Sequence, residues 1–235
     1  MSASERRGAA RTAVVWDVLR PVLGDGGRDV LDIGGGTGGF AVKVAELGHR
    51  VSVVDPSPDA LAALARRARE IGVEVAGQQG DLHSLVSAVG ADSADVVLCH
   101  GVLEVVDDPA AALATLREVL RPGGTLSLLV AQRHAAVLAR AMAGHFQQAL
   151  ALLEPGATTG RSGHRFTHDE ITGLLADAGF ATSSVHGIRV FADLVPGSLL
   201  DLEPGATAAL VELERAVAVL PDYHPLATQL HLIAT

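Results

Sequence analysis

The feature that most constrains this chain is a glycine-rich stretch directly after a short apolar run. Residues Val30–Ile33 are apolar except for Asp32, and five glycines with one threonine follow them. Apolar residues at helical spacing come next, so the pattern predicts a buried strand, a tight turn and a helix. Gly34, Gly36 and Gly38 let the backbone turn without Cβ clashes and let a ligand approach the main chain closely. We therefore expect a cofactor at this turn, and we expect Asp32 to be an acid that supports the glycine turn.

The spacing of these glycines does not by itself choose between cofactors. It reads G-x-G-x-G, and counted from Gly34 to Gly39 it also satisfies the dinucleotide fingerprint G-x-G-x-x-G. The next expected strand, 50–55, ends in Asp55, an acid suited to bind a ribose diol. NAD and S-adenosylmethionine both carry that diol, so these two motifs leave both cofactors open.

Strand-like and helix-like segments alternate along the chain. Their short connections predict right-handed βαβ units and a parallel sheet. We expect strands at 30–33, 50–55, 73–76, 94–99, 125–130, 180–190 and 229–234, and helices at 9–23, 39–48, 56–71, 109–120, 134–153, 168–178 and 207–220. Thr167 and Glu170 have the spacing of a capping box, and the acids Asp107 and Asp108 are expected to cap the helix that begins at Pro109.

The regular alternation stops after the fifth expected strand. Residues 132–165 and 192–225 contain no βα unit, and we expect them to be insertions at the carboxyl edge of the sheet that form the substrate side. The sequence shows no internal repeat and no second independent domain. We therefore predict one domain, 1–235, with a cofactor-binding core at 25–130.

Composition excludes several classes of function. The formal net charge of −9 argues against a broad basic surface for nucleic acid or anionic membranes. Cys99 is the single cysteine, so an internal disulfide is excluded. No apolar run reaches the roughly 18 residues of a membrane span, and the N-terminus is polar, which favours a cytoplasmic protein. His164 and His168 are separated by an expected helix start and have no third ligand nearby, so we expect no metal.

Further polar residues follow the later strands. Because the carboxyl ends of parallel strands share one edge, these residues are expected near the glycine turn. Asp81 is placed to accept a hydrogen bond from an adenine amino group, and Leu82 with Pro56 can sandwich the adenine ring. His100 ends the fourth strand, close to where a reactive methyl group would lie. It is expected either to act as a base or to hold the backbone near the cofactor.

These motifs, taken in order, resemble class I S-adenosylmethionine-dependent methyltransferases. The resemblance covers residues 25 to 130 and rests on Val30–Gly38, Asp55, Gly80-Asp81 and Leu120–Gly124. It implies an α/β fold, a doubly wound, mostly parallel seven-stranded sheet of the Rossmann-like methyltransferase type with helical insertions at its carboxyl edge. It also implies S-adenosyl-L-methionine as the cofactor, and weighs against an NAD dehydrogenase.

A narrower resemblance extends into the insertions. The segments His100–Pro109, Ala143–Phe146 and Gly187–Phe191 are similar to bacterial tRNA 5-carboxymethoxyuridine methyltransferases, which methylate the carboxylate of a modified wobble uridine. By this resemblance Arg11 contacts the methionine carboxylate of the cofactor, and Arg189 lies on the substrate side. The family's aromatic and basic residues are thinned out here: Ala131–His134 replaces aromatic and Asn residues after the fifth strand.

The expected reaction is methyl transfer to a tRNA wobble carboxylate. A carboxylate is already ionised and needs no general base, so we expect no catalytic acid or base, and an anion-binding arginine instead. Arg189 or Arg133 can serve as that residue. The alternatives are a small-molecule carboxylate or hydroxyl as acceptor, and a non-catalytic cofactor-binding module.

Overall fold

The computed structural model describes residues 3–154, 163–201 and 205–235, and it describes side chains from residue 12 onward except at residue 201. Contacts divide the chain into two compact units. We call Val22–Leu129, Thr172–Ser183 and Leu232–Thr235 the glycine-loop unit, and Met1–Pro21, Val130–Ile171 and Ser184–His231 the insertion unit. Each unit is described below by itself.

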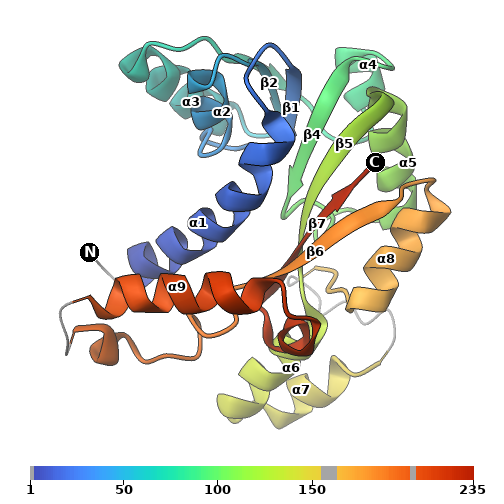
Figure 1. Cartoon of the computed structure of the whole chain (residues 1–235). Coiled ribbons are helices and arrows are strands. Elements are labelled where there is room, and N and C mark those ends of the chain that lie inside the picture. Colours follow the sequence, from blue (N-terminus) through green and yellow to red (C-terminus); the bar gives the residue numbers. More distant parts are fainter. Residues whose placement is uncertain (1–2, 155–162, 202–204) are drawn as a thin grey trace. The chain divides into compact units, whose positions relative to one another are not determined.

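The described strands form a seven-stranded sheet of order β3-β2-β1-β4-β5-β7-β6 (Figure 1). Strands β1 to β5 pair in parallel. Ala181 and Thr235 exchange both backbone hydrogen bonds beside β6 and β7, the pattern of an antiparallel pair. The sheet therefore has the mostly parallel topology that the sequence predicts. The strands are β1 (Asp29–Ile33), β2 (Arg50–Asp55), β3 (Ala76–Gln79), β4 (Ala94–His100), β5 (Leu120–Ala131), β6 (Thr182–Ile188) and β7 (Gln229–Ala234).

Helices of the glycine-loop unit lie on both faces of its strands. Figure 1 shows α2 and α3 on one side of β1 and β2, and α4 and α5 on the other side of the strands. The helices are α1 (Ala3–Leu23), α2 (Ala41–Glu46), α3 (Pro58–Ile71), α4 (Leu85–Val89), α5 (Pro109–Val119), α6 (Arg133–Met142), α7 (Phe146–Ala151), α8 (His168–Asp177) and α9 (Ala206–Ala218), with 3₁₀ turns η2 (Gly197–Asp201) and η3 (Pro221–Leu226).

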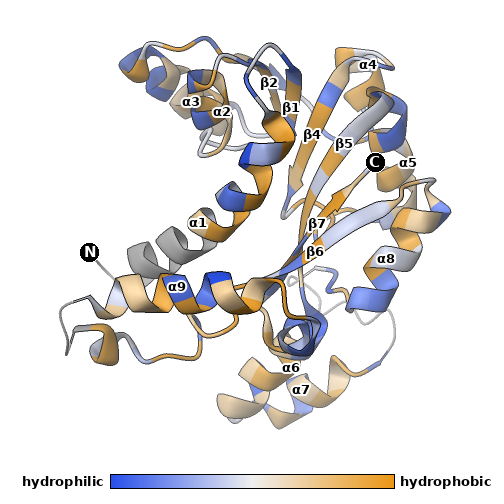
Figure 2. Cartoon of the chain, in the orientation of Figure 1, coloured by the Kyte–Doolittle hydropathy of each residue, from blue (hydrophilic) through white to orange (hydrophobic). Residues whose placement is uncertain are grey.

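Central strands are buried on both faces, as parallel sheets require. Strand β4 is apolar from Val96 to Cys99 and fully buried there, and Figure 2 colours most of it as hydrophobic. Strand β3 is exposed along its whole length because it forms the edge of the sheet. The carboxyl ends of four strands coincide, since Ile33 pairs with Val54 and Cys99, and Asp55 pairs with Gln79.

Several predicted elements differ from the structure. The third strand was expected at 73–76, but it forms at Ala76–Gln79, where pairing with Ser52–Asp55 fixes its position. The helix expected over 134–153 is divided into α6 and α7 because Gly144 takes a left-handed φ of 77° between them. The fifth strand also extends further than predicted and includes the turn at Arg121–Gly124.

Helix caps lie where the sequence predicts them. Gly72 ends α3 in the left-handed conformation. At the start of α8 the Thr167 N–H donates to Glu170 Oε2 at 2.9 Å, and the Glu170 N–H donates to Thr167 Oγ1 at 3.3 Å, which completes the capping box. Asp108 Oδ1 accepts the N–H groups of Ala110 and Ala111 at 3.0 Å each, so Asp108 rather than Asp107 is the N-cap of α5. No helix within the described residues is long and apolar enough to cross a membrane.

Replacing Asp108 by Ala removes this cap, and we expect the free energy of unfolding to fall by about 1 kcal/mol. Asp107→Ala is the matched control, because it removes the neighbouring exposed carboxylate without touching the cap. We expect it to change stability by less than about 0.5 kcal/mol. Chemical denaturation of the three proteins measures both values. Equal losses in the two variants would contradict the assignment of the cap.

Candidate active site

The glycine turn follows β1 in the glycine-loop unit, and two of its glycines are required by packing. Gly34 and Gly38 have φ values of +68° and +78°. A Cβ atom at Gly34 would overlap Val102, and one at Gly38 would overlap Leu64. The loop can therefore lie close to its neighbours only without side chains at these positions.

Gly36 differs from these two glycines because it faces open space next to Asp55. Its φ is +55°, and a Cβ atom would come no nearer than 3.9 Å to Asp55 Oδ2. The Gly36 N–H donates to Asp55 Oδ2 at 2.8 Å, and the Ser57 N–H donates to Asp55 Oδ1 at 2.9 Å. Asp55 thus joins the turn after β1 to the turn after β2. Each carboxylate oxygen has a second lone pair, which a ribose hydroxyl can use.

Asp32 is a buried acid under the same turn. Its side chain is 4% exposed, and a Cβ atom on Gly35 would lie 2.6 Å from Asp32 Oδ2. Burial, and to a smaller extent the charge of Asp55, raises the pKa of Asp32 to about 7. Near neutral pH this carboxyl therefore exists in both protonation states, and its protonated form can donate a hydrogen bond.

The turn after β2 and the end of β3 lie together. Gln79 Nε2 donates to the Pro56 carbonyl at 3.3 Å, and the Gly80 N–H donates to the Asp55 carbonyl at 3.2 Å. Asp81 is exposed, and its Oδ1 accepts the N–H and the hydroxyl of Ser84 at 3.0 and 2.9 Å. These bonds from Ser84 lower the pKa of Asp81, so it stays ionised. Asp81 has a structural partner as well as its predicted role toward adenine.

The residues expected to enclose an adenine ring differ in exposure. Pro56 is exposed at the turn after β2, whereas Leu82 is buried with 5% of its surface accessible. Pro56 can present a ring face to a ligand. In this conformation Leu82 packs in the core, so its predicted contact with adenine needs a side-chain movement.

His100 lies at the end of β4 beside the glycine turn. Its Nε2 is 2.9 Å from Ser127 Oγ, and its ring meets Phe40 edge to face with centroids 5.1 Å apart. Phe40 directly follows the glycines, so His100 contacts the loop through this ring. The hydrogen bond to Ser127 orients the imidazole. The role of His100 as a base stays a prediction.

These residues fit S-adenosylmethionine. The open cradle at Gly36, next to a carboxylate that still has lone pairs for a diol, is what a ribose needs. The end of β3 contacts Pro56 at the same edge, where the adenine ring is predicted to bind. Arg11, expected to bind the methionine carboxylate, has its side chain outside the described part of the structure.

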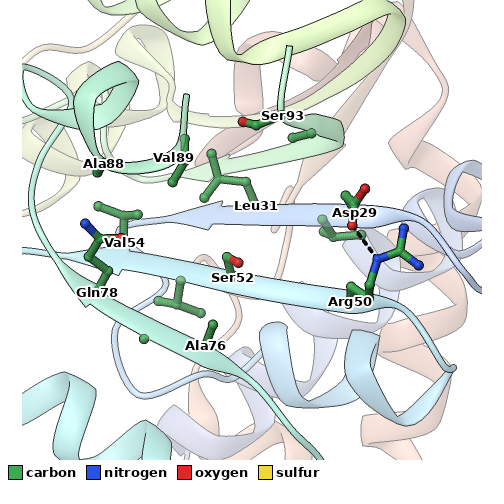
Figure 3. A pocket seen from close by; sticks show the side chains of 14 residues that line it. Asp29, Leu31, Arg50, Ser52, Val54, Ala76, Gln78, Ala88, Val89 and Ser93 are labelled. Atoms are coloured by element: carbon green, nitrogen blue, oxygen red, sulfur yellow. Dashed lines mark hydrogen bonds and ion pairs between the residues drawn. The ribbon is translucent and has the colours of Figure 1, made fainter. Parts of the chain in front are cut away.

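The glycine-loop unit contains a cavity of about 330 Å³, and Gly36, Asp55 and Pro56 do not line it. Figure 3 shows Leu31, Ser52 and Val54 facing it from β1 and β2. The ion pair between Arg50 Nε and Asp29 Oδ1, at 2.6 Å, lies at one end. The lining continues to Val54 and Gln78 near the carboxyl ends of β2 and β3, so this cavity extends along a face of the sheet, and it includes neither Asp55 nor the glycine turn.

Arg133 belongs to the insertion unit, where it is already engaged. Its side chain is 8% exposed, its Nη1 lies 2.7 Å from Glu170 Oε1, and its Nη2 donates to the Arg165 carbonyl at 3.2 Å. The same Glu170 completes the capping box of α8. Arg133 therefore ties the start of α6 to α8, and its predicted role toward a substrate competes with this structural one.

Arg189 is the more available of the two predicted arginines. It follows β6 with a positive φ of 58°, unusual for a residue with a side chain. Its Nε lies 3.3 Å from Asp193 Oδ2, and its side chain is 24% exposed. The Thr228 N–H donates to the Arg189 carbonyl, the Thr228 hydroxyl shares its one proton between that carbonyl and Asp193, and the Thr228 carbonyl accepts the Gln132 N–H. Thr228 thus links the Arg189 turn to the residue before Arg133.

Glu214 belongs to the same network and was not predicted from the sequence. It is fully buried in the insertion unit and binds the backbone of residues 190–192. The detectable sign is an acid between Leu210 and Val217 on the apolar face of α9. Within the described residues no group of three or more His, Cys, Asp or Glu side chains could hold a metal ion.

The raised pKa of Asp32 predicts a dependence of stability on pH. The folded-state pKa, about 7, exceeds the ordinary value of 3.8, so folding favours the protonated form. Relative to Asp32→Asn, the wild type should therefore lose about 2 kcal/mol of unfolding free energy between pH 5 and pH 7. Chemical denaturation of both proteins without cofactor measures this difference. Parallel pH profiles for the two proteins would show that Asp32 titrates normally.

Comparison with known proteins agrees with the geometry. A family model described as a methyltransferase domain matches residues 31–128, from β1 to β5. The tRNA 5-carboxymethoxyuridine methyltransferase of Escherichia coli is 31% identical over 97% of this chain and 88% of its own length. A ubiquinone biosynthesis O-methyltransferase of Xanthomonas axonopodis is 31% identical over 69% of this chain and 66% of its own length.

The fold has the same relatives. The solved structure of an S-adenosylmethionine-dependent methyltransferase from Mesorhizobium loti superposes with a TM-score of 0.61, at 22% identity, and covers 96% of this chain and 99% of that chain. The edge with Gly36 and Asp55 is where the cofactor of such enzymes is expected from the sequence motifs. On these grounds the chain belongs to the class I S-adenosylmethionine-dependent methyltransferases, and it is an enzyme that uses S-adenosylmethionine.

Proposed function

We propose that this methyltransferase esterifies the carboxylate of a modified wobble uridine in tRNA. One observation carries the proposal: the similarity to the tRNA 5-carboxymethoxyuridine methyltransferase of Escherichia coli covers 97% of the chain, and so includes the insertion unit. The methyltransferase domain model covers residues 31–128 alone, which lie in the glycine-loop unit. The shared insertion unit is the part in which the acceptor residues are predicted.

The chemistry asks little of the protein beyond positioning. S-adenosylmethionine supplies an electrophilic methyl group, and a carboxylate oxygen attacks it in line while the carbon–sulfur bond breaks. The carboxylate is ionised at neutral pH, so no base has to remove a proton. The protein contributes orientation and exclusion of water. An arginine that grips the second carboxylate oxygen, or both oxygens from one side, fixes the attacking lone pair.

Arg189 has the donors for this role. A guanidinium carries five N–H donors, and Arg189 Nε lies 3.3 Å from Asp193 Oδ2 in an ion pair without hydrogen-bond geometry. Asp193 is itself held by the Thr228 hydroxyl at 2.7 Å. Asp193 therefore orients the guanidinium from one edge, and its Nη groups can receive an acceptor carboxylate. Arg133 has its Nη groups committed to Glu170 and to the Arg165 carbonyl.

The insertion unit also provides a cavity beside this network. It measures about 510 Å³ and is lined by α6 together with Gln132, Arg165, Asp193 and Thr228. Alanines of α6 give it an apolar wall, and two of its polar residues contact Arg189: Thr228 binds the Arg189 carbonyl, and Asp193 pairs with the guanidinium. An apolar wall with a few placed polar groups suits a flat ring that carries hydrogen-bonding groups.

A small-molecule carboxylate or hydroxyl is the second candidate acceptor. The similarity to a ubiquinone biosynthesis O-methyltransferase and the net charge of −9 favour it. A hydroxyl acceptor needs a base, and His100 would supply it. The two candidates differ in their response to salt, because tRNA binding weakens steeply as salt rises and binding of a small neutral molecule does not.

Arg189→Ala should raise the acceptor KM roughly 10- to 100-fold, as expected when a charged hydrogen-bond partner is lost. Cofactor affinity, measured by calorimetry, should stay within about twofold because Arg189 is predicted on the acceptor side. Arg215→Ala is the charge-matched control: it removes a cation of the same unit that pairs with Asp17 and Glu212 at the surface. An unchanged acceptor KM in Arg189→Ala would exclude the proposed role.

A further inference from the structure

Glu214 on α9 is a fully buried carboxylate that binds three consecutive backbone N–H groups. Its Oε2 accepts from Val190 at 2.8 Å, and its Oε1 accepts from Phe191 and Ala192 at 2.9 and 2.7 Å. The residue is 0% exposed. The three hydrogen bonds are short and charge-assisted, and their donors belong to the turn directly after Arg189.

The same face of α9 also holds the side chains of this turn. Leu210 packs with Ala192, and Val217 packs with Val190, each in a cluster that includes Phe191. Leu210, Glu214 and Val217 are spaced four and three residues apart, so they share one face of the helix. Figure 2 shows α9 with both hydrophobic and hydrophilic stretches along its length. Apolar contacts on either side of Glu214 exclude water from its hydrogen bonds.

The backbone conformation of Arg189 makes this arrangement possible. Arg189 takes a positive φ of 58° directly after β6, and the next three N–H groups converge on one carboxylate. Successive N–H groups that converge in this way form an anion-binding concavity. A left-handed arginine is strained, so the surrounding contacts have to hold it. Thr228 holds its carbonyl from the other side.

Burial of a carboxylate is costly, and an apolar residue on this face would avoid that cost. An apolar residue would leave three N–H groups of a buried turn without an acceptor. Glu214 is therefore matched to the Arg189 turn, because it supplies the acceptor that these three N–H groups need. Arg189 is the residue proposed to bind the acceptor, so the turn that Glu214 fixes is the one that presents its guanidinium.

We propose that Glu214 is a positioning residue. It fixes the backbone of the 189–192 turn and so holds the Arg189 guanidinium in position to bind an anionic acceptor. The inference rests on the proposed function for the nature of that acceptor. The fixing of the 189–192 turn by Glu214 does not depend on the proposed function. Glu214 touches neither cofactor nor acceptor, and it acts through Arg189. Glu214→Gln keeps the size of the side chain and replaces one acceptor oxygen by a donor that faces the N–H groups.

The first experiment tests, without any acceptor, whether Glu214 fixes the 189–192 turn. Backbone amide exchange at 190–192 should be at least about tenfold faster in Glu214→Gln than in the wild type. Labelling of Arg189 by phenylglyoxal, followed by peptide mass spectrometry, should also become faster. Glu212→Gln is the matched control, because it makes the same change at an exposed position of α9. Exchange and labelling in Glu214→Gln that match this control would overturn the proposal.

The second experiment asks whether Glu214 acts through Arg189. Glu214→Gln should raise the acceptor KM about tenfold in the wild-type background and less than about twofold in the Arg189→Ala background. Cofactor affinity should stay constant in both backgrounds. An equal rise in both backgrounds would overturn the positioning role. If the wild type methylates no tRNA, the proposed acceptor fails, and the amide exchange and the Arg189 labelling decide the inference by themselves.

Discussion

The carboxylate of Asp55 joins two turns at the carboxyl edge of the sheet, where the cofactor is predicted to bind. It accepts one N–H from the glycine turn after β1 and one from the turn after β2, each over less than 3 Å. These turns belong to neighbouring parallel strands whose carboxyl ends are in register. A single carboxylate can therefore fix the distance between the two turns and still offer lone pairs to a ribose. Gly36 leaves open space beside Asp55, and Asp32 lies buried under the same glycine turn.

The insertion unit uses carboxylates in a comparable way, to hold turns that present arginines. Glu170 holds Arg133 and completes a helix cap, and Glu214 holds the backbone after Arg189. Arg133 is engaged by Glu170 and by the Arg165 carbonyl, whereas Arg189 is the arginine proposed to bind the acceptor. A methyltransferase that acts on a carboxylate needs this kind of rigid anion-binding group more than it needs a base. The proposed acceptor and the arrangement of these residues are consistent for that reason.

Much of this could be predicted from local sequence. The glycine turn, Asp55, the capping box at Thr167 and Glu170, and the cap at Asp108 each depend on residues that are near in the chain or at fixed spacing. Strand β3 was misplaced because Val73–Val75 has the stronger strand composition, while the pairing with β2 decides the outcome. Glu214 was missed because its partners are more than twenty residues away. An acid on an amphipathic helix is normally solvated, and only the tertiary contacts show that this one is buried.

The central claim is that this cofactor-binding fold serves a carboxylate on tRNA. The most direct measurement is transfer of labelled methyl groups from S-adenosylmethionine to bulk tRNA from cells that lack this protein. The account predicts that label enters the tRNA and is released by mild alkali, because a carboxyl ester hydrolyses under conditions that leave methylated bases and riboses intact. An absence of label in tRNA, with cofactor binding verified by calorimetry, would contradict the account and assign the methyl group to a small molecule.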